Sequence, residues 1–117
     1  MDTEQYASVD DLIASTLTEE DHTLPSGRRV RIRALSRAEV LRIQKLGKDN
    51  VVKLEAETVA AGLVAPRLTV EQASRWQAAD AAGGDIGNLM EAIRDLSGLS
   101  EGAAKAAYKS DGAQAGG

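Results

Sequence analysis

The chain has 117 residues, of which 43% are hydrophobic and 27% charged, and it contains no cysteine. These values are typical of one folded domain with a modest core, and they exclude disulfide bonds and thiolate chemistry. No apolar run approaches the length of a membrane span, and the acidic start of the sequence lacks the pattern of a signal peptide. We therefore expect a cytoplasmic protein without a membrane segment.

The N-terminal segment precedes the predicted core of the domain. Residues 1–7 show no periodic pattern, and we expect them to be flexible. Ser8 and Asp11 are candidate caps of a short helix. The apolar stripe of this helix contains Val9, Leu12, Ile13 and Leu17. An acidic cluster at 19–21 follows, and it is expected to be solvated.

A β-hairpin is predicted at about residues 22–34, with a first arm at 22–24 and a Pro-Ser-Gly turn. In the second arm Val30 and Ile32 alternate with arginines, which is typical of a half-buried strand. A two-stranded hairpin is marginally stable in water. This one must therefore pack on helices or gain strands from a neighbouring subunit.

Four helices are predicted after the hairpin. Capping boxes of Ser36 with Glu39 and of Thr69 with Gln72 introduce the first and third, and Gly98 is expected to end the fourth in a left-handed cap. The four helices are expected at about 37–46, 51–63, 70–82 and 85–96, the last capped by Asp85, with a further short helix at 100–108. Residues 109–117 are expected to be a flexible tail. The sequence thus predicts a mostly α, single domain at 8–108, with four to five helices and an N-terminal β-hairpin.

Positive charge is concentrated in one part of this acidic chain. Between Arg28 and Lys53 there are nine Lys or Arg residues and two acidic ones, whereas the remainder carries a net charge of −11. This asymmetry indicates either a nucleic-acid-binding surface or a strand whose wet face is lined by Arg29, Arg31 and Arg33. The acidic remainder and the lack of stacking aromatics among the basic residues favour the solvated strand. We expect no nucleic-acid partner.

Candidate catalytic groups are scarce. His22 is the single histidine and has no partner at a motif spacing, and GGDIG at 83–87 lacks a phosphate-binding pattern. We predict no catalytic residue, cofactor or metal site, and expect no enzyme activity. Trp76, the single tryptophan, is either a core filler or an anchor for a partner.

Three segments carry a resemblance to a known family. They are the hairpin segment VRIRALSRAEVLRI, the middle segment AAGLVAPRLTVEQA and the closing helix IGNLMEAIRDLSGLS. Their order and spacing, from about Leu24 to Ser100, resemble the tail assembly chaperones of long-tailed bacteriophages and prophages. The resemblance implies a protein of the host bacterial cytoplasm that binds the tape measure protein, keeps it soluble, helps to recruit tail tube subunits and is absent from the mature virion.

Self-association is also expected, because many copies would bind along one long client. The candidate contact surfaces are the free edge of the hairpin and the apolar face of 51–63. The candidate partner-binding residues are Arg29, Arg31, Arg33, Val52, Val59, Leu63 and Trp76. Two alternatives remain open: a small nucleic-acid-binding or regulatory module using the Arg-rich strand, and a minor structural protein of the phage head or tail.

Overall fold

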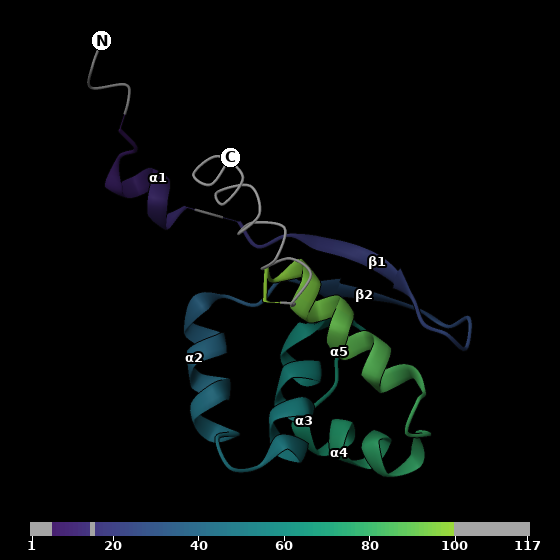
Figure 1. Ribbon diagram of the computed structural model, residues 1–117. Helices are drawn as coiled ribbons and strands as arrows, with labels where there is room; N and C mark the ends of the chain where they lie inside the picture. Colours follow the sequence, from purple (N-terminus) through teal and green to yellow (C-terminus); the bar gives the residue numbers. More distant parts are fainter. Residues whose placement is uncertain (1–5, 15, 100–117) are drawn as a thin grey trace, which may run out of the picture.

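The computed structural model describes residues 6–14 and 16–99 (Figure 1). Over these residues the chain forms five helices and three strands, which confirms the predicted mostly α fold with an N-terminal hairpin. The elements are α1 (Val9–Ile13), β1 (Glu19–Thr23), β2 (Arg29–Arg33), α2 (Arg37–Leu46), α3 (Val51–Gly62), β3 (Leu63–Ala65), α4 (Val70–Ala79) and α5 (Asp85–Leu96). Of the N-terminal segment expected to be flexible, 1–7, residues 1–5 lie outside the described residues, as do the predicted helix at 100–108 and the tail at 109–117.

The hairpin belongs to a three-stranded antiparallel sheet with the order β1-β2-β3. Its first arm begins at Glu19, earlier than predicted, because the acidic residues of β1 lie opposite the arginines of β2. β3 is not predicted from the sequence, since this three-residue strand directly follows α3 without a turn. The strand that completes the sheet therefore comes from the same chain.

Helices α2 to α5 gather on one side of the sheet, whereas α1 lies beyond the start of β1, away from them (Figure 1). Helix α3 contacts α2, α4 and α5. This central position suits its small buried residues, Ala56 and Gly62. A Cβ atom at Gly62 would lie 2.5 Å from Cδ1 of Ile93, so glycine permits the close approach of α3 and α5.

One hydrophobic core joins the sheet to these helices. It is built from aliphatic side chains, as the near absence of aromatic residues requires. Its members are Leu24, Ile32, Leu35, Val40, Ile43, Ala56, Val59, Leu63, Ala73, Ile86, Leu89 and Ile93. Ile32, Leu89 and Ile93 are fully buried and thus tie β2 to α5.

The helix ends agree with the predicted caps except at α5. The capping boxes of α2 and α4 are present, and Gly98, with a φ of 76°, ends α5 in a Schellman motif. Asp85, however, is the first residue of α5 and makes no cap bond. Instead, Oδ2 of Asp80 accepts a hydrogen bond from the Ile86 N–H at 2.8 Å. Asp80 ends α4 with an extended backbone, so that helix is shorter than predicted.

Candidate protein-binding site

The arginines of β2 are paired with carboxylates of their own chain. Arg31 donates from Nε to Oε1 of Glu19 at 2.9 Å and from Nη1 to Oδ1 of Asp21 at 2.8 Å. Arg29 donates from Nη2 to Oδ2 of the same Asp21 at 2.9 Å. The bonds to Asp21 and Glu19 raise the pKa of Arg31 above its ordinary value. The acidic cluster thus neutralises the wet face of the Arg-rich strand.

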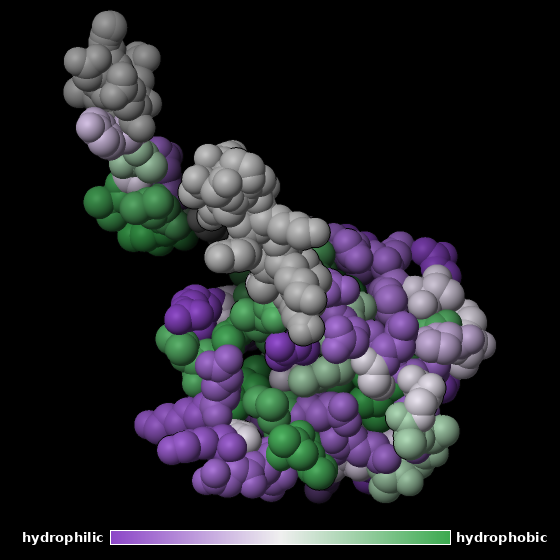
Figure 2. Space-filling view, viewed as in Figure 1, coloured by the Kyte–Doolittle hydropathy of each residue, from purple (hydrophilic) through white to green (hydrophobic). Residues whose placement is uncertain are grey.

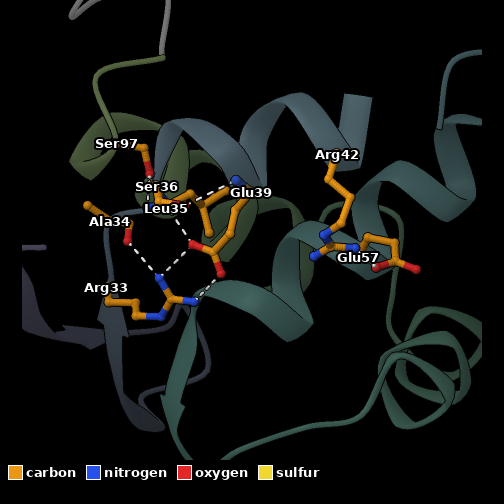
Figure 3. A network of polar contacts seen from close by, with 8 residues as sticks. All are labelled: Arg33, Ala34, Leu35, Ser36, Glu39, Arg42, Glu57 and Ser97. Atoms are coloured by element: carbon orange, nitrogen blue, oxygen red, sulfur yellow. Dashed lines mark hydrogen bonds and ion pairs between the residues drawn. The ribbon is translucent and has the colours of Figure 1, made fainter. Parts of the chain in front are cut away.

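Arg33 belongs to a polar network where β2 passes into α2 (Figure 3). Its Nη1 and Nη2 donate to Oε1 and Oε2 of Glu39 at 2.8 and 2.5 Å, and Nη1 also donates to the Ala34 carbonyl at 3.1 Å. Oε1 of Glu39 accepts a further bond from the Ser36 N–H at 2.9 Å. The capping box and the bidentate ion pair therefore share one carboxylate.

This network lowers the pKa of Glu39 to about 2, chiefly through the hydrogen bonds from Arg33. Hydrogen bonds of Ser97 also join the segment between β2 and α2 to the end of α5. Oγ of Ser97 accepts a bond from the Leu35 N–H at 2.8 Å and donates to the Ile93 carbonyl at 2.7 Å. We call the group Arg33, Ser36, Glu39 and Ser97 the polar latch. Arg33 thus stabilises the fold by joining β2 to α2.

The hairpin turn is held by the buried carboxylate of Asp85. Oδ2 of Asp85 accepts bonds from Oγ of Ser26 at 2.6 Å and from Nη2 of Arg28 at 2.7 Å, and Oδ1 accepts from the Ser26 N–H at 3.1 Å. These bonds, first of all that from the Ser26 hydroxyl, lower the pKa of Asp85. The residue expected to cap α5 therefore fixes the turn against the start of that helix.

An apolar groove of 540 Å³ lies between the hairpin, the segment after β3 and α4. Its volume is in the range of ligand pockets, roughly 300–1,000 Å³. The lining residues are Leu24, Arg28, Arg29, Val30, Leu63, Pro66, Leu68 and Trp76. Six of these eight are apolar, and the two charged ones are both arginines. We call this feature the Trp76 groove.

The structure brings three of the predicted partner-binding residues, Arg29, Leu63 and Trp76, to this groove. Trp76 also packs against the core, which agrees with its interpretation as a core filler. Leu63, 5% exposed, contributes mainly to the core.

The other predicted residues are separate from the groove lining. Val59 is 1% exposed and cannot contact a partner, which corrects the prediction that one apolar face of 51–63 is a contact surface. Val52 is 60% exposed near the start of α3. Arg31 pairs with residues of β1, and Arg33 is part of the polar latch. The predicted set therefore does not form one surface.

The groove residues missing from the predicted set are Leu24, Arg28, Val30, Pro66 and Leu68. A signal for the last two was present, because the sequence LVAPRL at 63–68 places apolar residues and a proline between two helices. Nothing in the sequence shows that this segment returns to β2, where Ile32 pairs with Leu63.

The free edge of the hairpin is less suited to self-association than expected. β3 covers one side of β2, and the remaining edge of the hairpin, on β1, carries Glu19, Glu20 and Asp21. A second copy paired there would bring like charges across from each other, which destabilises a strand pair.

A second apolar surface lies on α1. Val9, Leu12 and Ile13 are 70%, 67% and 76% exposed, and Figure 2 shows their helix as an apolar body away from the main domain. At the other end of the molecule, Val51 and Val52 are also exposed. These two sites are convex, whereas the Trp76 groove is concave and is the candidate binding site.

The single histidine, His22, lines a small pocket together with Glu20 and Asp95. Nε2 of His22 lies 2.6 Å from Oδ1 of Asn88, so its neighbour is an amide. Residues 6–14 and 16–99 contain no group of three or more His, Cys, Asp or Glu side chains able to hold a metal ion. None of the described helices is long and apolar enough to cross a membrane.

Comparisons with protein-family models, with curated proteins and with solved structures find no match for this chain. Its function is therefore inferred from the pattern of its sequence and the geometry of the Trp76 groove.

Proposed function

We propose that this protein is a phage tail assembly chaperone that binds apolar helical segments of the tape measure protein in the Trp76 groove. It keeps this client soluble in the host bacterial cytoplasm, helps to recruit tail tube subunits and is absent from the finished particle. The resemblance of its three sequence segments supports the identity of the client. The apolar groove supports the mode of binding.

The observation that carries the proposal is the chemistry of the groove lining. Leu24, Val30 and Leu68 offer aliphatic surface, and Trp76 offers a large flat side chain of the type that dominates binding interfaces. An apolar stripe of a helix fits such a groove with little demand for a specific sequence. A chaperone that binds many segments of one long client needs this tolerance.

The ion pairs of the hairpin favour this function over nucleic-acid binding. Arg31 pairs with two carboxylates of its own chain, and Arg33 forms a bidentate pair with a third. A phosphate backbone would have to compete with these carboxylates while approaching Glu19 and Asp21.

Co-expression with the tape measure protein tests the proposal. We expect the wild-type chain to keep the tape measure protein in the soluble fraction and to co-purify with it. Leu68→Glu places a charge in the groove and is expected to abolish both effects. Val52→Glu is the matched control, since Val52 was a candidate contact outside the groove lining, and it is expected to behave as wild type.

Circular dichroism of both variants confirms that they fold. A tape measure protein that stays insoluble with the wild-type chain would refute the proposed function, and loss of binding in Val52→Glu alone would refute the proposed site. Mass spectrometry of purified particles distinguishes a structural subunit, which is present in virions, from a chaperone, which is absent.

A further inference from the structure

Helix α1 has the properties of a segment that docks elsewhere. It has five residues and a complete capping box between Ser8 and Asp11, yet none of its residues is buried. A helix of this length is unstable alone in water, and its stability must come mainly from packing of its apolar face. The exposed Val9 and Ile13 provide such a face.

The charges of α1 and of the Trp76 groove are complementary. Asp10 and Asp11 lie in the first turn of α1, and its last turn has no basic residue. Arg28 and Arg29 line the groove, with side chains that are 65% and 70% exposed. A guanidinium has five N–H donors, so both arginines can bind a further carboxylate while keeping their partners Asp85 and Asp21.

The two surfaces lie toward opposite ends of the hairpin. α1 precedes the start of β1, whereas the groove is lined by Leu24 and Arg28 beside the turn (Figure 1). A contact between different surfaces of two copies is heterologous, and it builds chains or rings instead of closed two-fold dimers. A second copy can therefore place its α1 along the groove while its own groove stays open.

We propose that the Trp76 groove of one molecule binds helix α1 of a second copy of this chain. Val9 and Ile13 pack on the apolar lining, and Asp10 and Asp11 face Arg28 and Arg29. The contact covers the groove in the absence of client and links copies head to tail. The inference rests on the proposed function in one respect, that the tape measure segment competes with α1 for the same groove.

Cysteine cross-linking tests the contact, because the native chain contains no cysteine. Full-length Ile13→Cys and tagged Leu68→Cys are mixed under mild oxidation. The control mixture pairs Ile13→Cys with tagged Val51→Cys, since the native Val51 and Ile13 side chains are both 76% exposed. We expect the mixed disulfide to form at least about tenfold faster with Leu68→Cys, and circular dichroism verifies that each variant folds.

Three results decide the inference. Equal rates in the two mixtures would overturn it, as would a double variant, Ile13→Cys with Leu68→Cys, that closes its disulfide within one chain at high dilution. Faster cross-linking to Leu68→Cys that also falls on addition of a tape measure fragment supports both the contact and the competition. A fragment that binds without reducing the cross-link would refute the groove as the client site and leave the α1 contact standing.

Discussion

The two ends of the hairpin use their side chains in opposite ways. Where β2 passes into α2, Arg33 and Glu39 form a bidentate ion pair within the polar latch. Beside the turn, Leu24, Val30 and Trp76 leave an apolar groove open. At the first end, charge joins two elements of the fold. At the turn, the Arg28–Asp85 pair also holds the chain, but apolar surface beside it is left for a partner. Within the basic strand, Arg33 therefore contributes to the fold, whereas Arg29 lies at the groove.

The largest expected effect comes from two isoleucines that receive the same substitution. Ile93 is 0% exposed in the core, and Ile93→Ala should lower the free energy of unfolding by about 2–5 kcal/mol. Ile13 is 76% exposed on α1, and Ile13→Ala should change it by less than about 0.5 kcal/mol. Urea denaturation of both variants measures the difference. Similar losses would show that α1 is part of the folded core.

The polar latch gives a stability contribution that depends on pH. The pKa of Glu39 falls from 4.5 to about 2 on folding. The ionised Glu39 carboxylate therefore stabilises the folded state fully above pH 4.5, and this stabilisation is lost as the pH falls from 4.5 toward about 2. Glu39→Gln should lower the free energy of unfolding by roughly 1–3 kcal/mol near neutral pH. The difference in free energy of unfolding between wild type and variant should narrow as the pH is lowered below 4.5.

Urea denaturation at neutral and at acidic pH measures that difference. Asp85 also has a lowered pKa, so its contribution to stability depends on pH as well. Because wild type and variant both contain Asp85, this contribution cancels from the difference between them. A difference of the same size at each pH would mean that Glu39 stabilises the protein by packing and not by its charge.

The exposed arginines should give the smallest effect on the fold. Arg29→Gln with Arg31→Gln breaks ion pairs whose side chains are 42–70% exposed, and each such pair contributes about 0–1 kcal/mol. Arg33→Gln alone should destabilise more than this double variant, because it leaves Glu39 without its bidentate partner. Thermal unfolding compares the two. The reverse order would contradict the assignment of Arg33 to the latch.

Local signals in the sequence predict much of this fold. The capping boxes at Ser36 and Thr69 and the glycine cap at Gly98 are short-range features, and the structure confirms them. The alternation at Val30 and Ile32 correctly predicts a strand with one buried face.

Long-range partners are the part that the sequence does not predict. β3 forms because Leu63 pairs with Ile32, from which it is separated by thirty residues of chain. Asp85 binds Ser26 and Arg28 of the turn instead of capping α5. The groove depends on both arrangements. For that reason, the predicted site includes the buried Val59 and lacks five residues of the groove lining, which are Leu24, Arg28, Val30, Pro66 and Leu68.

The fluorescence of Trp76 tests the central claim most directly, because this is the single tryptophan of the chain and it lines the groove. The full-length protein is titrated with a tryptophan-free helical fragment of the tape measure protein. We predict a saturable shift of the emission to shorter wavelength, absent in Leu68→Glu and retained in Val52→Glu. Binding of a labelled fragment, seen by anisotropy, with no change in Trp76 emission would contradict the claim that the groove holds the client.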